Sequence, residues 1–353
     1  MSSVKNFYKR TIYLFYYLKM LDLQKFRQFL EYVNDTTKLS KVRLVWDAVV
    51  SVYRYNIGLI DYFYFKFYEK DHQERDKWMG TGYKYEYDLI MNPVQERHIL
   101  QNKIHFFEAF TPYVKHATCT LNDLIANNVK AQRVLQNRSG KIAIKDALGQ
   151  CGWDVEIKNV VEFSREQLIA YMQGKGFNLA EEFIIQHPDL ALLSDTGLNT
   201  VRLITQINAE GGVDFIGPTL RITVNSQVDN MAVGNVAAPI DINTGKIKGK
   251  GAYQDIRKEP VDAHPVTGVP LIGFQVPYWD EVLRICREAA LYNTRNKSIG
   301  WDVAITADGP SFVEGNHNWC KLLWQLPAGE GLKYVLEKYK LEAHIIVSAN
   351  KQK

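Results

Sequence analysis

The stretch WDVAITADGPSFVEGNHNW, residues 301–319, constrains the fold of this chain more than any other segment. Two runs rich in strand-forming residues flank a turn signal at 308–310, which predicts a β-hairpin. In this hairpin Asp302 is expected roughly opposite Gly315, and strand alternation sends side chains two residues apart to the same face. The pattern therefore predicts that three oxygen-bearing side chains meet at the open end of the hairpin: Asp302, Glu314 and Asn316.

Two neighbouring carboxylates in a half-buried place repel each other, which makes this clustering costly without a positive charge among them. A hard divalent cation removes the cost, and Mg²⁺ is commonly held by one or two carboxylates together with waters and phosphate oxygens. An asparagine carbonyl suits the same coordination shell. The same residues also fit a solvated hairpin end in which the asparagine is only a turn residue, and the hairpin alone does not decide between the two interpretations.

The composition indicates a globular protein of two or three structural units. The chain has 353 residues, of which 46% are hydrophobic and 23% charged, and no low-complexity tract or repeat is visible. The cysteines lack the CxxC or Cys/His spacing of a zinc site, which favours reduced thiols in a cytoplasmic protein: Cys119, Cys151, Cys286 and Cys320.

The N-terminal part of the chain is more basic and more aromatic than the rest. Residues 1–95 hold 15 Lys/Arg, 11 Asp/Glu and 13 of the 20 tyrosines, whereas residues 96–353 hold 28 of each charge. The apolar run at 11–18 has no signal-peptide cleavage site after it, and the stretch 44–68 carries charged residues, so we expect neither export nor a membrane span. Such a region can contact an anionic membrane surface or a partner, or simply pack as a helical core with solvated tyrosines.

Residue periodicity divides the chain near Pro93. Apolar residues recur at helical spacing in 5–33 and 41–70, whereas short strands alternate with helices after about residue 96. A capping-box pattern, Ser164 with Gln167, predicts a helix that ends near 174–176.

A strand that carries lysines is the second feature that indicates a ligand-binding function. In KIAIK, residues 141–145, the isoleucines face one way and the lysines the other, and the segment at 155–161 is expected to return beside it. The following loop contains Gly149 and Gly152, which let backbone amides approach a ligand closely.

The other elements predict an α+β fold with antiparallel sheets. Strands are expected at 181–185, 200–208 and 220–225, with helices at 278–295 and about 329–340. Neither a GxGxxG fingerprint nor a Walker A sequence occurs, which argues against a Rossmann dinucleotide site and a P-loop.

The order of these features resembles the ATP-grasp fold. It is most similar to the sugar-transfer-associated branch, over roughly residues 96–325, and five segments carry the resemblance: NTVRLIT (199–205), QVDNMAVGN (227–235), INTG (242–245), IGWDVAI (299–305) and VEGNHNW (313–319). The resemblance implies two α+β lobes with the nucleotide between them. It divides the chain into an N-terminal helical region (1–95), a nucleotide-binding lobe (96–190) and a metal-binding lobe (191–353).

The resemblance assigns phosphate-binding roles to two lysines. Lys145 matches the strand lysine that contacts the α- and β-phosphates, and Lys103, in QNKIHFF, resembles the earlier lysine of the same clamp. Compact positive donors suit a triphosphate, although either residue can also be an ordinary surface lysine.

The stretch EEFIIQHPD resembles the hinge between the lobes. By this resemblance Glu182 lies by the adenine edge, the backbone near Ile185 bonds a ring nitrogen, and Asp189 accepts from the ribose hydroxyls. Glu181 can take the place of Glu182, since the register is open by one residue. Asp189, which follows a proline, can alternatively be a helix or turn cap.

Two strand arginines complete the implied site. Arg202 and Arg221 lie in otherwise apolar strands, where a guanidinium generally has an anionic partner. The resemblance implies that this partner is the γ-phosphate or an acyl phosphate and that both arginines act with Lys145 in catalysis. Asp302, Glu314 and Asn316 match the metal triad for Mg²⁺, with Mn²⁺ as the alternative.

One departure from the superfamily pattern bears on the acceptor chemistry. Amide-forming ligases of the superfamily commonly have an arginine just before the first metal carboxylate, whereas here Gly300 and Trp301 precede Asp302.

The resemblance implies an ATP-dependent ligase that forms an amide through an acyl phosphate. The expected substrates are a uronic acid of a surface polysaccharide or its precursor and an amino acid or amine, with a glycan, a glycosyltransferase or the membrane surface contacting residues 1–95. A cytoplasmic protein, alternatively attached at the inner membrane surface, is expected, without a nucleic acid partner. Two other functions stay open: a kinase of a sugar or glycan hydroxyl, and a non-catalytic scaffold of glycan synthesis.

Overall fold

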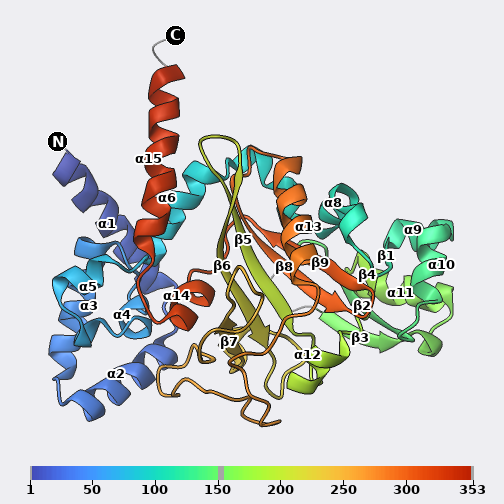
Figure 1. The fold of residues 1–353 in the computed structure, drawn as a ribbon, viewed down its shortest axis with the longest axis horizontal. Coiled ribbons are helices and arrows are strands. Elements are labelled where there is room, and N and C mark those ends of the chain that lie inside the picture. Colours follow the sequence, from blue (N-terminus) through green and yellow to red (C-terminus); the bar gives the residue numbers. More distant parts are fainter. Residues whose placement is uncertain (1, 150–154, 351–353) are drawn as a thin grey trace.

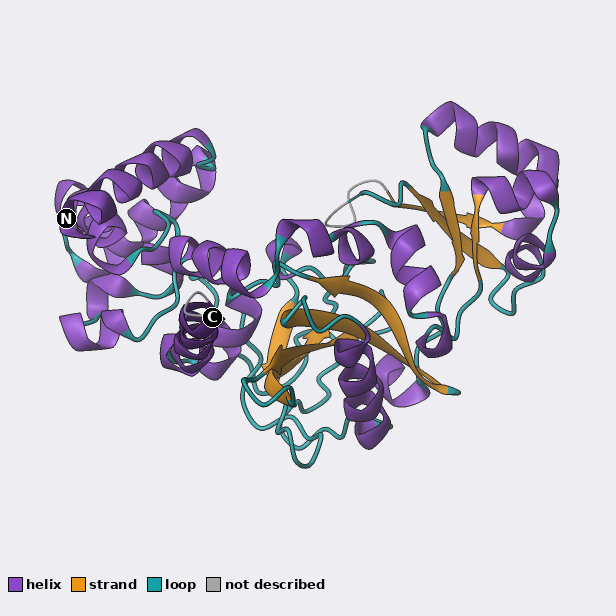
Figure 2. Ribbon diagram, turned by 90° about the horizontal axis from the view of Figure 1, so that it is seen from above, coloured by secondary structure: helices purple, strands orange, loops and turns teal. Residues whose placement is uncertain are grey.

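The computed structural model describes residues 2–149 and 155–350 of the chain. Gly152 and Cys151 lie outside these described residues. Within them the fold is α+β with antiparallel sheets, as predicted, and N-terminal helices precede two sheets (Figure 1). The N-terminal helices, the larger sheet and the smaller sheet follow one another along the length of the molecule (Figure 2).

The N-terminal helices pack around their own aromatic core. They are α1 (Ser2–Lys19), α2 (Leu23–Thr37), α3 (Lys41–Tyr55), α4 (Asp61–Tyr64), η1 (Phe67–Glu69), α5 (His72–Asp76) and α6 (Thr81–Met91). The predicted helical spacing is thus confirmed, with a break at residues 20–22 because Asp22 caps the start of α2 by accepting from the Lys25 amide. Ser40 caps α3 in the same way. Phe29, Leu44 and Phe63 are among the buried residues of this core.

The smaller sheet has the strand order β1-β4-β2-β3, and all of its pairings are antiparallel. Its elements are β1 (Thr118–Thr120), α9 (Leu121–Ala126), α10 (Val129–Leu135), β2 (Lys141–Lys145), β3 (Val155–Asn159), η4 (Val160–Glu162), α11 (Arg165–Lys175) and β4 (Leu179–Glu182). Ile142 and Ile144 are fully buried against the helices, while Lys145 faces the other way. The predicted capping box opens α11, and Gly176 ends it in the left-handed conformation.

The larger sheet has the order β7-β6-β5-β8-β9. Its strands are β5 (Thr200–Ile207), β6 (Val213–Ile222), β7 (Val236–Pro239), β8 (Ser298–Thr306) and β9 (Gly309–Asn316). The remaining elements are η2 (Val94–Glu96), α7 (His98–Gln101), α8 (Lys103–Ala109), η3 (Thr111–Tyr113), α12 (Pro188–Leu193), η5 (Met231–Val233), α13 (Trp279–Tyr292), α14 (Leu322–Ala328) and α15 (Lys333–Asn350).

Both faces of the larger sheet are covered. Trp301 and Phe312 stack on one face with a ring separation of 4.9 Å, in a core that includes residues of α8 and α13. On the other face Ile204 and Ile216 pack with residues of α6 and α15. Helix α6 therefore packs on the larger sheet.

The predicted hairpin forms, but its register differs by one residue. Asp302 pairs with Glu314 instead of Gly315. A β-bulge between Asp302 and Val303 places an additional residue, Val313, on β9, and without this bulge Asp302 would pair with Val313. Gly309, with a φ of 104°, closes the turn in a conformation that favours glycine. Asp302, Glu314 and Asn316 nevertheless share one face, as alternation requires.

No helix in residues 2–350, among those described, is long and apolar enough to cross a bilayer. Cys119, Cys286 and Cys320 are free thiols, which agrees with the sequence-based expectation.

Candidate functional site

A cavity of about 260 Å³ lies between the two sheets. Strands β2 and β4 form one wall, while β8, β9 and the loop at 227–230 form the other. The described lining residues include three cationic and six acidic side chains: Lys103, Lys145, Arg221, Asp146, Glu181, Glu182, Asp229, Asp302 and Glu314. Charged groups far apart in the sequence thus converge on one space.

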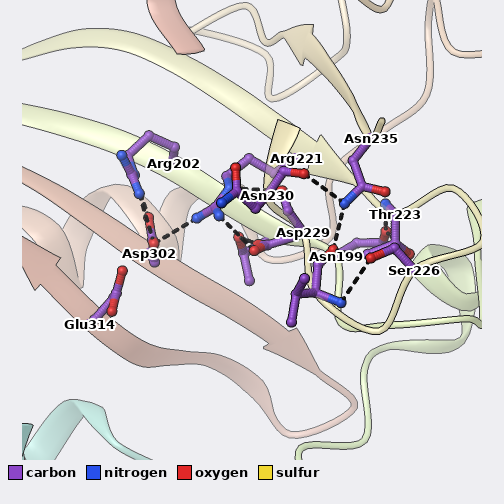
Figure 3. A network of polar contacts seen from close by, with 12 residues as sticks. Asn199, Arg202, Arg221, Thr223, Ser226, Asp229, Asn230, Asn235, Asp302 and Glu314 are labelled. Carbon is purple, nitrogen blue, oxygen red and sulfur yellow. Dashed lines mark hydrogen bonds and ion pairs between the residues drawn. The ribbon is translucent and has the colours of Figure 1, made fainter. Parts of the chain in front are cut away.

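Asp302 is the centre of a buried charge cluster (Figure 3). Arg202 donates to both of its oxygens, with Nη2 at 2.8 Å from Oδ2, and Arg221 Nη1 donates to Oδ2 at 2.7 Å. Burial by itself raises the pKa of this carboxyl, but the charges of the two arginines outweigh it and hold the pKa at about 2. Asp302 is therefore an anionic partner of both arginines within the protein, and their contact with a phosphate stays a prediction.

Glu314 lies beside this cluster without a close cation of its own. Lys103 Nζ is 4.0 Å from its Oε2, and Asn316 Nδ2 donates to its Oε1 at 3.1 Å. Burial and the neighbouring Asp302 carboxylate raise the pKa of Glu314. Among the described residues, no group of three or more His, Cys, Asp or Glu is arranged to hold a metal ion. The expected triad differs from such a group because its third member is an amide.

Lys145 meets a second buried carboxylate on the opposite wall. Its Nζ is 2.7 Å from Oε1 of Glu181, and His116 Nε2 is 3.7 Å from Oε2 of the same residue. His116 Nδ1 in turn lies 3.1 Å from the Ser311 hydroxyl on β9. Burial raises the pKa of Glu181, but the charge of Lys145 and the contact with His116 outweigh it and leave the pKa at about 2. This chain of contacts links the smaller sheet to the larger one.

The charge balance of the cavity fits a divalent cation together with a phosphate chain. Six lining carboxylates face three cations, so a triphosphate alone would enter an already negative space. Glu314 accepts a hydrogen bond from Asn316 and lies 4.0 Å from Lys103, which leaves its carboxylate with room to coordinate a cation. Asp302 already accepts three hydrogen bonds from arginines, which leaves it about one lone-pair direction. The oxygen-only donor set suits Mg²⁺ or Mn²⁺.

The glycine loop and the first lysine adjoin the cavity. Lys103 Nζ donates to the Gly149 carbonyl at 2.5 Å, and both residues line the cavity. The predicted nearness of Lys103, Lys145 and Gly149 is therefore found, whereas Gly152 belongs to the residues that are not described.

The hinge residues are placed differently from the expectation. Phe183 and Ile184 line the cavity, whereas Ile185 is 59% exposed and Asp189 is exposed in the first turn of α12; neither is among the lining residues. These exposures concern the side chains, so the contact of the Ile185 backbone with a ring nitrogen stays a prediction. The alternative of Asp189 as the helix cap is not found either, because the N-cap of α12 is His187, whose Nδ1 accepts from the Asp189 backbone amide.

The sequence does not decide which of Glu181 and Glu182 occupies the hinge position, and the two side chains have different surroundings. Oxygens of Glu182 accept from the backbone amides of Ala117 and Arg138, so this side chain ties adjoining segments together. Glu181 instead points toward Lys145, as alternation along β4 requires.

Asp229 is a lining residue that sequence reasoning missed. It accepts from Arg221 Nη2 at 2.6 Å and from the Thr200 hydroxyl, and burial raises the pKa of its carboxyl. The only sequence signal was its place in QVDNMAVGN, and the buried partner on another strand gives no local pattern. Arg221 thus bridges two carboxylates, Asp229 and Asp302 (Figure 3).

A comparison with protein families finds a match over residues 84–340, more than half of the chain. The matching family model is described as sugar-transfer associated ATP-grasp. A search of curated proteins gives no match.

Three solved structures that resemble this chain are distant from it in sequence. D-cycloserine synthetase is 11% identical, with 71% of this chain and 73% of that one covered and a TM-score of 0.41. D-alanine-D-alanine ligase from Coxiella burnetii is 11% identical, with coverages of 72% and 62% and a TM-score of 0.39. The biotin carboxylase domain of Hydrogenobacter thermophilus 2-oxoglutarate carboxylase, in complex with MgADP and bicarbonate, is 14% identical, with 68% of this chain covered and a TM-score of 0.39. This chain spans only 48% of that last structure's chain.

Proposed function

Because the chain belongs to the sugar-transfer associated ATP-grasp family, we propose that it is an ATP-dependent ligase that joins a carboxylate to an amine. The proposed carboxylate belongs to a uronic acid of a surface polysaccharide or its precursor, and the amine to an amino acid or another small amine. The observation that carries the proposal is the cavity between the sheets, where the Asp302–Glu314 pair faces the Lys145 wall.

The residues of the cavity divide into two groups by their chemistry. Lys103 and Lys145 supply compact positive charges for the phosphate chain. Glu314, Asp302 and Asn316 would hold Mg²⁺, which when bound neutralises phosphate charge during transfer. Arg202 and Arg221 fix Asp302, and Arg221 also presents its guanidinium to the cavity.

The proposed reaction has two balanced steps. A substrate carboxylate oxygen bonds to the γ-phosphorus as the bond to the bridging oxygen of ADP breaks, which gives an acyl phosphate and ADP. The amine nitrogen then bonds to the carbonyl carbon, phosphate leaves with the electron pair of the broken C–O bond, and the amine gives up a proton. Positioning and charge stabilisation account for such a reaction without a nucleophilic side chain.

The test combines substrate panels with two readouts. The full chain is incubated with Mg-ATP, a panel of uronic acids and a panel of amino acids and amines, and free phosphate and product mass are measured. Phosphate release together with a product equal to the two substrates minus water supports a ligase. ADP formation with the phosphate retained on the product would show a kinase and contradict the proposal.

A pair of matched variants separates the site from general effects. Glu314→Gln should lower kcat/KM by about 100-fold or more, as loss of a group that stabilises transition-state charge does. Because burial beside Asp302 already disfavours its charge, the same change should leave stability unreduced. Glu288→Gln, at an exposed residue that pairs with Arg284, should keep wild-type activity.

A further inference from the structure

The net charge of the chain is confined to its first helix. Residues 1–21 hold four of the 43 Lys/Arg and none of the 39 Asp/Glu, so residues 22–353 hold 39 of each. On α1 the inward side is tied down, since Arg10 and Lys9 pair with Glu86 at 2.7 and 3.1 Å. Lys5 and Lys19 have no ion-pair partner among the described side chains.

The outward side of α1 is apolar and open to solvent. Side chains at spacings of three and four residues share one helix face, and Val4, Tyr8, Ile12 and Phe15 are 74%, 69%, 50% and 69% exposed. Tyr13, Leu14 and Tyr17 of the same helix are partly buried on its inward side. An apolar face this open is unusual, because folding normally buries such side chains.

The apolar surface continues onto α3. Val42 and Trp46 are 81% and 69% exposed and lie at the same helical spacing as Tyr53. Tyr53 joins the two helices, since its ring stacks on Phe7 at 5.1 Å and its hydroxyl lies 3.3 Å from that of Thr11. Of the 32 large apolar side chains that are exposed in the described part of the chain, 12 lie within residues 4–46.

We propose that this α1/α3 face, formed by Val4, Phe7, Tyr8, Ile12, Phe15, Val42 and Trp46, binds the surface of a bilayer that contains anionic phospholipid. The helices lie parallel to the surface, with the aromatic rings at the headgroup boundary and Lys5 and Lys19 against lipid phosphates. An apolar helix face flanked by lysines and free of carboxylates is the pattern of an interfacial helix. The N-terminal helices lie at the end of the molecule opposite the smaller sheet, which leaves this face accessible (Figure 2).

The charge distribution favours an anionic surface over a second copy of the chain. A two-fold dimer places the same patch against itself, so Lys5 and Lys19 of one α1 would approach those of the other without carboxylates of α1 between them. An anionic bilayer satisfies both the apolar and the charged components. The inference is independent of the ligase proposal because it uses no residue of the cavity.

Sedimentation of the full chain with lipid vesicles tests the inference. We expect binding to vesicles of phosphatidylcholine mixed with phosphatidylserine, and weak binding to phosphatidylcholine alone. Each of Lys5→Gln and Lys19→Gln should weaken the binding about fivefold, the equivalent of about 1 kcal/mol per basic residue at an anionic surface. Phe15→Glu should weaken it by about tenfold or more, because it removes a buried ring and adds a like charge.

A matched control and a second readout keep the test sharp. Val161→Glu introduces the same charge at a 92% exposed apolar residue of the smaller sheet's η4, and should bind vesicles like wild type. All variants should melt at the wild-type temperature. Equal binding by wild type and Phe15→Glu, or no vesicle binding, would overturn the inference, as would a dimer in light scattering that Phe15→Glu dissociates without any vesicle binding by wild type.

Discussion

The cavity between the sheets and the α1/α3 face carry charge of opposite sign. The charges of the cavity are mostly paired and buried, whereas those of the α1/α3 face are exposed. In the cavity the carboxylates outnumber the cations, and most of the charges are held in ion pairs such as Arg202–Asp302 and Lys145–Glu181. On α1 the cations occur without carboxylates, and Lys5 and Lys19 face solvent beside exposed rings. The first arrangement suits the metal cation and phosphates that we propose for the cavity, and the second suits the anionic surface that we propose for α1.

The difference predicts where a mutation acts. A buried ion pair is part of the folded structure, so removal of one partner leaves a desolvated charge and lowers stability. An exposed apolar or basic residue contributes little to folding, so its removal changes only what the surface binds. The two regions should therefore separate stability from binding, and the following changes test this separation from the largest effect to the smallest.

Asp302→Asn should have the largest effect on stability. It leaves Arg202 and Arg221 without the buried carboxylate between them, and we expect a loss of about 3–5 kcal/mol in the free energy of unfolding. Urea denaturation measures the change. Asp255→Asn, at a partly exposed pair with Arg257, is the control and should cost less than about 1 kcal/mol. Similar losses of stability in both variants would contradict a stabilising role of the buried ion pairs of Asp302.

Acid should weaken the protein through Glu181. Its pKa is about 2 in the folded state against 4.5 unperturbed, so its contribution is complete above pH 4.5 and is lost as the pH falls toward 2. The shift corresponds to about 3 kcal/mol. In urea unfolding across this range, Glu181→Gln should show a smaller loss with falling pH than wild type. Glu210→Gln, at an exposed turn, should keep the wild-type slope, and parallel curves for wild type and Glu181→Gln would contradict the assignment.

Gly300→Ala should lower stability by about 1–3 kcal/mol, because overpacking in a fixed core is costly. The added Cβ would lie 2.6 Å from the Trp319 Cβ and 3.3 Å from the Arg202 Cδ, and Trp319 is buried. Gly174→Ala, in α11 with open space around it, should instead be neutral or stabilising. A Gly300→Ala variant as stable as wild type would show that Trp319 and Arg202 can move to accommodate the added methyl group.

Tyr8→Ala should have the smallest effect on folding. The side chain is 69% exposed on α1, so the free energy of unfolding should change by less than about 0.5 kcal/mol. The same urea measurement applies, with vesicle binding as the second readout. A loss above about 1 kcal/mol would indicate that the ring is packed, and the contrast between the two regions would fail.

Local patterns predicted local structure well. The alternation in KIAIK placed Ile142 and Ile144 in the core and Lys145 on the ligand side, and the capping box of Ser164 located the start of α11. The turn signal predicted the β8–β9 hairpin, and alternation placed its three oxygen-bearing side chains on one face. Each of these depends on neighbouring residues only.

Features that depend on distant residues were not predictable. The β-bulge at Val313 has no sequence signature, and it makes Glu314 instead of Val313 the partner of Asp302. The partners of the strand arginines lie on other strands, so Asp302 was expected to hold a metal and not also two guanidinium groups. The hinge was placed by resemblance, and Ile185 and Asp189 have exposed side chains outside the residues that line the cavity.

Calorimetric titration of the full chain with ADP, in the presence of Mg²⁺ and in the presence of EDTA, tests the central claim most directly. With six carboxylates and three cations around the cavity, nucleotide should bind with Mg²⁺ and lose most of its affinity in EDTA. Glu314→Gln should weaken the Mg²⁺-dependent binding, while Phe15→Glu on α1 should leave it unchanged. Equal affinity with and without the divalent cation would contradict a metal–nucleotide site between the two sheets.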